Sequence, residues 1–282
     1  MLIHLRKARS GDRQAVLEIE KKATPSLLYL PFVFDPFMND EEGEFIVAEA
    51  DEHLVACGKF TVLPDGSAWL EALRVIPERK GQGIGKEFYR RFLEIARSKK
   101  ILTLRMYTGI NNNTSKGLAE RFGFAIAGIY RGLKYPCQPG MLQPVAAAFQ
   151  PVIEPDLAEK LLMGYLEPWQ GFLVLNRTFY ALTPALAAYL ARQRQVYHDP
   201  VSQSTIMLGA RFMPQQALHI GILGGDLKSC LSFALQLGMQ GGVGSLSCYL
   251  PASATEMQAE FFRYGFQAEA FDLIVMEANL HS

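Results

Sequence analysis

The most constraining feature of the chain is the segment 70–86, where an apolar run reaching Pro77 leads into three alternating glycines and an amphipathic helix. The glycines are Gly81, Gly83 and Gly85. Glycine lets successive backbone N–H groups turn toward one point, and a helix start adds unpaired amides and the positive end of its dipole. Three basic residues surround the turn: Arg79, Lys80 and Lys86. The segment predicts an anion site, and a diphosphate-bearing cofactor is the expected ligand.

Two common nucleotide-binding motifs do not fit this spacing. A dinucleotide fingerprint needs a third glycine where this chain has Lys86. It also needs an acidic ribose ligand about twenty residues further on, where residues 102–107 are typical of a strand. A Walker P-loop needs glycine in place of Lys80 and Ser or Thr in place of Glu87. Both nucleotide interpretations therefore fail.

The glycine loop resembles the pyrophosphate loop of the GNAT acetyltransferases, whose usual form is Gln/Arg-x-x-Gly-x-Gly/Ala. The matching residues are Lys80, Gly81, Gln82, Gly83, Ile84 and Gly85. Lys80 replaces the usual Arg or Gln, which keeps a positive charge but loses the planar fork of a guanidinium. A second family pattern, Asn-x-x-Ala/Ser followed by Gly-Phe, is matched by Asn112, Ser115, Gly123 and Phe124. A glycine-rich turn without a ligand is the alternative interpretation of the first match.

The resemblance implies a site for acetyl-CoA. The backbone of three residues, Leu73, Arg74 and Val75, is then expected to pair with the pantetheine arm. The loop from Lys80 to Lys86 is expected to hold the diphosphate, and Asn112 to fix the pantetheine or the start of the next helix. No metal is implied, and the histidines and cysteines have no metal-ligand spacing.

Hydrophobic periodicity predicts an α/β (α+β) domain in the first half. Strands are expected at 2–8, 44–49, 53–62, 67–75 and 102–107, and helices at 13–24, at 86–97 and up to 121. Asp12 is the expected N-cap of the first helix. Residues 26–39 are aromatic and interrupted by proline, too irregular for one long helix. Over residues 2–132 the resemblance implies a mixed, mostly antiparallel twisted sheet flanked by helices.

Acetyl transfer to a primary amine needs a base, because an alkylamine with a pKa of about 10.4 is mostly protonated near neutral pH. Glu71 is the candidate base, since the two-residue period of a strand puts it on the same face as Leu73. Family members often place a Tyr general acid where this chain has Ala119. The proton donor to the leaving thiolate is therefore open, with Tyr107, Tyr130 and water as candidates.

The second half of the chain differs in composition and carries a partial repeat. The first 135 residues hold 21 Lys/Arg and 17 Asp/Glu, against 7 and 11 in the remaining 147. Residues 263–266 (RYGF) repeat residues 121–124 (RFGF) at an offset of 142. We therefore expect a GNAT domain at 1–134, a Pro-rich linker at 135–156 and a degenerate GNAT-like copy at 157–282. A helix-capping glycine that occurs twice by chance is the alternative.

The elements expected in the copy are strands at 171–175, 204–212, 217–223 and 244–250, and helices at 183–194, 226–239 and 254–264. In place of the glycine loop it offers only Gly224, Gly225 and Asp226. A carboxylate there repels phosphate unless it caps the following helix. The sequence therefore predicts one cofactor site, in the first half.

Overall composition limits the remaining functions. A net charge of zero gives no nucleic-acid footprint. No apolar run approaches the roughly twenty residues of a membrane span, and the amino terminus lacks a signal-peptide pattern. We therefore expect a cytoplasmic protein that binds neither nucleic acid nor membrane.

The predicted function is that of an acetyl-CoA-dependent N-acetyltransferase acting on a primary amine of a small molecule. An amino acid is one candidate acceptor, because residues 73–77, 108–109 and 119–124 look like the vertebrate histidine N-acetyltransferases. The low-charge second half is expected to wall the acceptor pocket or to form a homodimer face. A non-catalytic acyl-CoA-binding or sensing protein is the alternative.

Overall fold

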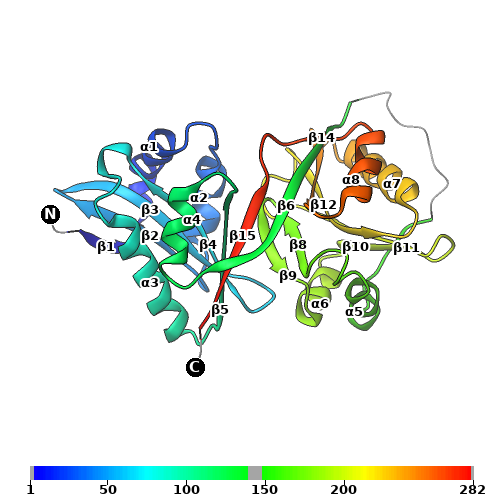
Figure 1. Cartoon of the computed structure of the whole chain (residues 1–282), viewed down its shortest axis with the longest axis horizontal. Coiled ribbons are helices and arrows are strands. Elements are labelled where there is room, and N and C mark those ends of the chain that lie inside the picture. The colour runs from blue at the N-terminus through cyan, green and yellow to red at the C-terminus, as the bar shows by residue number, and fades with distance from the viewer. Residues whose placement is uncertain (1–2, 139–147, 281–282) are drawn as a thin grey trace. The chain divides into compact units, whose positions relative to one another are not determined.

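The computed structural model describes residues 3–138 and 148–280 (Figure 1). Internal contacts divide the chain into two compact units. Unit 1 comprises Met1–Met106, Asn113–Ala125 and Met276–Ser282, and unit 2 comprises Tyr107–Asn112 and Ile126–Val275. Each unit combines a mixed, mostly antiparallel sheet with helices, as predicted for the fold class. A single cut near residue 134 does not describe this division, because the chain returns to unit 1 at residue 276.

The elements of unit 1 follow the predicted order. The strands are β1 (His4–Lys7), β2 (Glu44–Ala50), β3 (His53–Val62), β4 (Ala68–Val75) and most of β5 (Thr103–Gly109). The helices are α1 (Arg13–Ala23), α2 (Leu30–Met38), α3 (Ile84–Ser98) and α4 (Asn113–Glu120), with 3-10 turns η1 (Ser10–Asp12) and η2 (Pro77–Arg79). The sheet runs in the order β1-β2-β3-β4-β5, antiparallel except for the parallel pair β4 and β5.

The last strand of unit 1 comes from the far end of the sequence. In β15 (Leu273–Asn279), the residues from Met276 onward belong to unit 1. Leu280 N donates to Leu102 O at 2.7 Å, and Thr103 Oγ1 donates to Asn279 Oδ1 at 3.0 Å. No pattern in the sequence predicted this return, because it depends on pairing between residues far apart in the chain.

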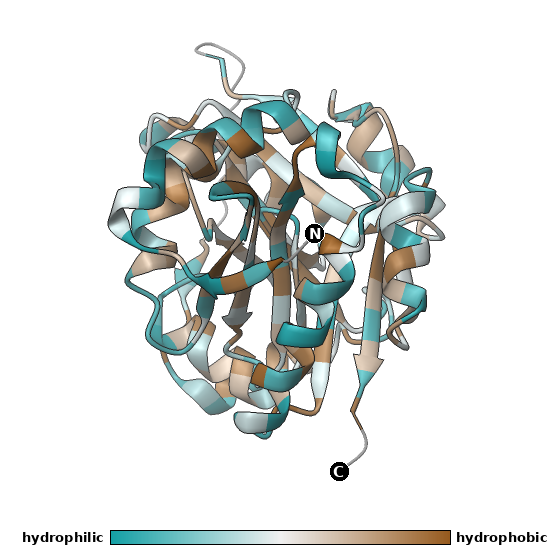
Figure 2. Cartoon of the chain, turned by 90° about the vertical axis from the view of Figure 1, so that its left-hand side faces the viewer, coloured by the Kyte–Doolittle hydropathy of each residue, from teal (hydrophilic) through white to brown (hydrophobic). Residues whose placement is uncertain are grey.

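Helices cover both faces of the unit 1 sheet. On one face α3 buries Phe88, Phe92 and Ile95, the residues predicted to face inward. A Cβ on Gly58 of β3 would lie 2.8 Å from the Phe88 ring, so glycine is needed for this close packing. On the other face, α1 and α2 pack over the sheet, where Phe37 contacts Phe45 edge to face at 5.4 Å. The helices in Figure 2 carry both teal and brown residues, as expected of helices with one buried side.

Two local details of unit 1 bear on the sequence-based expectations. Asp12 does stand at the N-cap of α1, but its carboxylate makes no capping bond there. It accepts instead from the Arg6 guanidinium, with Arg6 Nη1 2.7 Å from Oδ2, and from Arg9 N, also at 2.7 Å. Within the segment 26–39 there is no long helix, as expected, but the nine residues Leu30–Met38 form α2 despite Pro36 within it. Burial of Leu30, Val33, Phe34 and Phe37 compensates for the lost hydrogen bond.

Unit 2 repeats the same plan with extra elements. Its strands are β6 (Ala125–Pro136), β7 (Gln150–Pro151), β8 (Phe172–Leu175), β9 (Thr178–Ala181), β10 (Val196–Asp199), β11 (Ser204–Gly209), β12 (Leu218–Gly224), β13 (Ser245–Pro251) and β14 (Gln267–Ala268). Its helices are α5 (Pro155–Met163), α6 (Pro184–Arg192), α7 (Leu227–Gln240) and α8 (Thr255–Arg263). The sheet order is β6-β13-β12-β11-β10-β7, with β14 on β6, and β8 and β9 form a separate hairpin. β12 and β13 are parallel, as are β4 and β5.

The four strands and three helices predicted for the second half are all present. The elements of unit 2 that were not predicted are β6, β7, β9, β10, β14 and α5. β6 and α5 overlap the ends of the predicted linker 135–156, and β7 lies within it. β6 was missed because Gly128 and Gly132 interrupt its alternation. Residues 139–147 of that linker lie outside the described residues.

Candidate active site

The glycine loop of unit 1 has the geometry of an anion site. Gly81 and Gly83 adopt positive φ angles of 78° and 87°, and Gly83 is the N-cap of α3. A Cβ on either glycine would meet nothing within 4 Å, so the loop faces open space. Among residues 3–138 and 148–280, no group accepts a hydrogen bond from the amides of Gly81, Gln82 or Gly83. These amides and the helix start fit a phosphate group.

Of the three basic residues around the loop, two are free to interact with a bound anion and one is paired with a carboxylate. Lys80 and Lys86 are exposed beside it. Arg79 instead pairs with Asp51 at 2.7 Å, so its charge is partly neutralised.

The third glycine has a packing role, because a Cβ on Gly85 would lie 2.8 Å from Leu118 Cδ2 of α4.

β4 separates from β5 beside this loop. The parallel ladder joins Ala68 to Leu104 and Trp69 to Arg105, and within unit 1 it goes no further. Beyond that point β4 is bent, since the register with β3 shifts by one residue between Cys57 and Lys59. The shift is a β-bulge at Ala72, whose φ is +55°. Backbone groups on the β5 side of residues 70–75 are thereby available to a ligand.

The bulge corrects the predicted orientation of Glu71. Lys59 lies opposite Glu71, and Cys57 lies opposite Arg74. Because Cys57 and Lys59 are two residues apart on a regular strand, they share a face, and so do their partners. The prediction that Glu71 shares a face with Leu73 is therefore wrong. The extra residue at the bulge puts Arg74 there instead.

Glu71 is nearly buried on the face that carries α1 and α2. Its side chain is 8% exposed, and Thr61 Oγ1 donates to its Oε1 at 2.6 Å. The neighbouring Lys59 is fully buried and donates to the Asp40 carboxylate and, at 2.6 Å, to Phe60 O. Glu71 thus presents a carboxylate whose orientation is held by a neighbouring hydroxyl.

A second carboxylate, Glu20 of α1, lies close to Arg74 on the same face. Glu20 is 1% exposed and accepts from Tyr29 N and, at 3.0 Å, from Leu30 N, which begins α2. Burial raises the pKa of Glu20, and the nearby positive charge of Arg74 opposes that rise. The Arg74 guanidinium lies 5.8 Å from the centroid of the Tyr29 ring. Sequence analysis missed Glu20, Thr61 and Tyr29, because only folding brings α1 and β3 against β4.

The other predicted site residues belong to unit 2. Tyr130 is fully buried, donates from its hydroxyl to Trp169 O at 2.8 Å, and has a pKa raised by burial. Tyr107 is half-buried. Asn112 directly precedes α4, and its N–H donates to Gly109 O at 2.9 Å. Ala119, where the family often has Tyr, is fully buried in α4.

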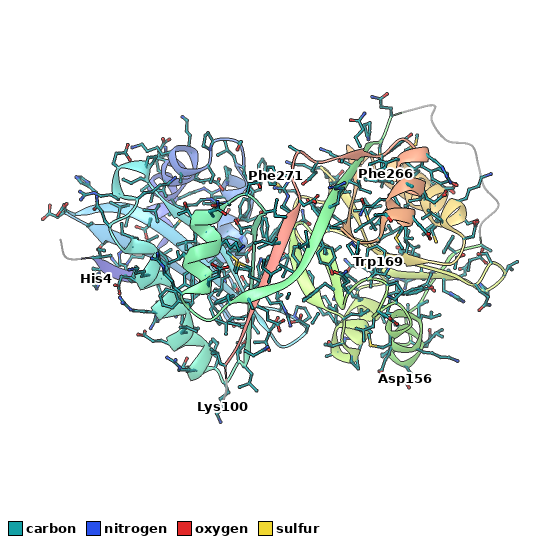
Figure 3. All side chains as sticks on the ribbon, viewed as in Figure 1. His4, Lys100, Asp156, Trp169, Phe266 and Phe271 are labelled. Carbon is teal, nitrogen blue, oxygen red and sulfur yellow. The ribbon has the colours of Figure 1, made fainter. Side chains whose placement is uncertain are left out.

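In unit 2, side chains lie against the end of β12 that does not pair with β13. β12 and β13 pair only from Leu218 to Ile220, and Gly221 is the extra residue of a bulge in β12 like the bulge of β4. Trp169, fully buried within unit 2 (Figure 3), donates from Nε1 to Leu223 O at 3.1 Å. The ring of Tyr165 lies against Gly224. Side chains of the same unit thus occupy the part of β12 that has left β13.

The start of α7 in unit 2 is also satisfied internally. Asp226 is its N-cap, and its carboxylate accepts from Ser229 N at 3.0 Å. This is the capping role that the sequence analysis considered for Asp226.

Among the described residues, no group of three or more His, Cys, Asp or Glu side chains is placed to hold a metal ion. None of the helices in residues 3–138 and 148–280 is long and apolar enough to span a bilayer.

Unit 1 thus combines a bulged strand that leaves its parallel neighbour with a helix that begins at a glycine loop. Residues 13–124 match the model of the Acetyltransferase (GNAT) family, so this part of the chain is a GNAT domain. GNAT acetyltransferases generally use acetyl-CoA and act on amines of small molecules or of proteins.

A Bacillus subtilis (strain 168) protein is 27% identical over 126 residues, which are 44% of this chain and 82% of that protein. Its name assigns it provisionally as a ribosomal protein bS18-alanine N-acetyltransferase. These findings identify the chain as an N-acetyltransferase and give no support to the non-catalytic alternative.

Solved structures share the fold over the whole chain. A GCN5-related N-acetyltransferase from Sphaerobacter thermophilus has a TM-score of 0.68 at 13% identity, covering 99% of this chain and 96% of that one. A tandem GNAT protein from the clavulanic acid biosynthesis pathway has a TM-score of 0.61 at 12% identity, covering 100% and 99%. At such low identity these likenesses establish the fold alone.

Proposed function

We propose that unit 1 transfers an acetyl group from acetyl-CoA to a primary amine of a small molecule. The observation that carries the proposal is the loop of unpaired amides at Gly81, Gln82 and Gly83, beside the bulged β4. Acetyl-CoA supplies an acetyl group activated as a thioester. The loop, with Lys80, Ile84, Gly85 and Lys86, binds its diphosphate, and the backbone of Leu73, Arg74 and Val75 binds its pantetheine arm.

Glu71 is the proposed base. It takes a proton from the acceptor ammonium, directly or through water, so that the nitrogen lone pair becomes free. The amine nitrogen then attacks the thioester carbonyl carbon. A C–N bond forms, the C–S bond breaks, and the sulfur leaves with the bonding electron pair. The nitrogen, positively charged after the attack, then loses its second proton to become an amide, and this proton replaces the one that the thiolate takes from its donor. The hydroxyl of Thr61, 2.6 Å from Glu71 Oε1, fixes the position of the carboxylate for this step.

The departing thiolate takes up a proton, for which three donors are proposed. Tyr107 and Tyr130 are the side-chain candidates, and water is the third. The contacts of Tyr130 are those of a core residue, because its hydroxyl already donates to Trp169 O. Tyr107 or water is therefore the stronger candidate. A thiol with a pKa of about 8.5 leaves readily as a thiolate, so water can serve in this step.

We further propose one cofactor site per chain. Unit 2 keeps the parallel strands and the bulge of a GNAT fold, which supports a second, degenerate copy within residues 157–282. Trp169 fills the space between its strands, and Asp226 caps its helix in place of a phosphate. Both features oppose binding of coenzyme A in unit 2.

Calorimetric titration with coenzyme A and an assay of thiol release from acetyl-CoA across an amine panel test this proposal. We expect one bound coenzyme A per chain and thiol release that depends on an added amine. Gly83→Glu should abolish binding, because a carboxylate then points into the anion site.

A matched pair separates this effect from backbone strain. Gly66 also has a positive φ, of 83°, with nothing within 4 Å of an added Cβ. Gly66→Ala and Gly83→Ala should lower the free energy of unfolding by similar amounts. Only Gly83→Ala should weaken the binding of coenzyme A. Unchanged affinity in Gly83→Glu would remove the loop from the mechanism.

A further inference from the structure

Arg74 is a cation with unused hydrogen-bond donors. Its Nε is buried and has no hydrogen-bond partner among the described residues. Its Nη1 makes one long bond, 3.3 Å, to the carbonyl oxygen of Leu73. A guanidinium has five N–H donors, and leaving a buried charged donor unpaired is costly. Arg74 is thus poised for a further acceptor group.

Glu20, a carboxylate of unit 1 close to Arg74, does not take this place. The charge of Arg74 acts on the pKa of Glu20, but no ion pair joins the two side chains in the described part of the chain. The Glu20 oxygens accept instead from the amides of Tyr29 and Leu30. Glu20 therefore fixes the start of α2 and leaves the Arg74 donors unmatched.

The bulge at Ala72 determines what Arg74 can reach. It brings Arg74 onto the sheet face of Glu71, the proposed base, as the next side chain along that face. Tyr29 lies against the guanidinium on the same side. The proposed base Glu71 and the N–H donors of Arg74 are therefore neighbours on the face of β4 where the acceptor is proposed to bind.

A guanidinium binds a carboxylate through two parallel N–H···O bonds, more tightly than it binds any neutral acceptor. A ligand that offers an ammonium to Glu71 and a carboxylate to Arg74 must carry the two groups close together. In an α-amino acid both are attached to the same carbon atom. We infer that the acceptor is a free α-amino acid, whose carboxylate is bound by Arg74 while its α-amine is acetylated at Glu71. This inference rests on the proposed acetyl transfer. A simple amine or a peptide amino terminus lacks the adjacent carboxylate and leaves Arg74 unpaired.

The test compares acceptors that differ in the carboxylate alone. A panel of α-amino acids, the corresponding amino acid amides and short peptides with the same first residue is assayed by thiol release. We expect kcat/KM for the preferred amino acid to exceed that for its amide and its peptide by about 100-fold, from the loss of a charge-assisted pair. Arg74→Gln should reduce this ratio to near one by lowering activity on the amino acid alone. Arg74→Lys should keep part of it, because the charge remains without the fork.

A control variant and a binding measurement keep the test independent of folding and turnover. Arg13→Gln removes another unit 1 arginine, which pairs with Asp35 at 2.6 Å on the α1 side, and should leave the preference unchanged. With coenzyme A present, the N-acetylated amino acid should raise the thermal midpoint of the wild type but not of Arg74→Gln.

Two results overturn the inference while acetyl transfer stands. One is equal activity of the wild type on the acid, the amide and the peptide. The other is an Arg74→Gln variant that loses activity equally on all three. Absence of thiol release with every amine would instead overturn the proposed function itself.

Discussion

Arg105 Nε donates to Glu277 Oε2 at 2.6 Å, although 172 residues separate the two in the sequence. Arg105 is 6% exposed, and its Nη1 also binds Asp65 Oδ2 at 2.8 Å and Ser67 Oγ at 2.7 Å. The guanidinium thus joins β5, the turn before β4 and the returning end of β15. This buried network fixes residues 276–279 as a strand of unit 1.

We expect Glu277→Gln to destabilise the protein by about 1–3 kcal/mol, because a charge-assisted bond to Arg105 is weakened while the arginine keeps Asp65. Urea unfolding followed by circular dichroism measures this. Glu41→Gln, an exposed carboxylate of the same unit, is the control and should stay within about 0.5 kcal/mol of the wild type. Equal stability of both variants would contradict the anchoring role of the pair.

A fragment of residues 1–134 should be markedly less stable than the same residues in the whole chain. It lacks the end of β15, so β5 keeps an unpaired edge that favours aggregation. A synthetic peptide of residues 270–282, added in trans, should raise its thermal midpoint and its solubility. A peptide with Ala at position 277 is the matched control, and equal rescue by both would discount the Arg105 contact.

Glu71→Gln should lower kcat by about 10²–10⁴-fold, the usual contribution of a general base, with little change in coenzyme A affinity. Thr61→Val removes the hydroxyl that holds the carboxylate and should lower kcat by a smaller factor. Thr61→Ser keeps the hydroxyl and should retain the kcat of the wild type. Steady-state thiol release and calorimetry supply the two numbers. An unaltered kcat in Glu71→Gln would exclude Glu71 as the base.

Trp169→Ala should destabilise unit 2 by about 3–5 kcal/mol, because it empties a fully buried site. Trp169→Phe keeps most of the volume but leaves Leu223 O without its indole donor, at a cost of about 1 kcal/mol. Chemical denaturation distinguishes the two variants. Coenzyme A stoichiometry should stay at one per chain in both, since Asp226 still caps α7. A second bound molecule in Trp169→Ala would contradict a single site.

Glu20 should make stability depend on pH. Its pKa is raised above the ordinary value of 4.5 by burial, so the folded chain holds this proton more tightly than the unfolded chain. The resulting stabilisation is present below pH 4.5 and is lost as the pH rises through the folded-state pKa. Glu20→Gln removes this loss, so its stability relative to the wild type should increase from pH 4 to pH 7. Denaturation at both values measures the trend, with Glu18→Gln as the exposed control on α1.

Local patterns predicted most of the fold and the position of the glycine loop in the candidate site. The loop 80–86 was recognisable because its glycines occupy fixed offsets, and α3 because its buried face repeats at helical spacing. The bulge at Ala72 was not, since alanine at positive φ has no sequence signature and its cause lies in pairing with β3. Without the bulge, Leu73 was predicted to share the sheet face of Glu71, and the presence of Arg74 on that face was not predicted. The return of β15 was hidden for the same reason, because sheet partners are chosen by tertiary contacts.

The position of β15 also bears on how the protein is made. A ribosome emits the chain from its amino terminus, so β1 to β5 emerge while residues 276–279 are still unsynthesised. Unit 1 therefore lacks this strand while residues 126–275 of unit 2 are being translated. Its sheet can close only after residues 276–279 have emerged, so folding of unit 1 has to wait for translation of unit 2.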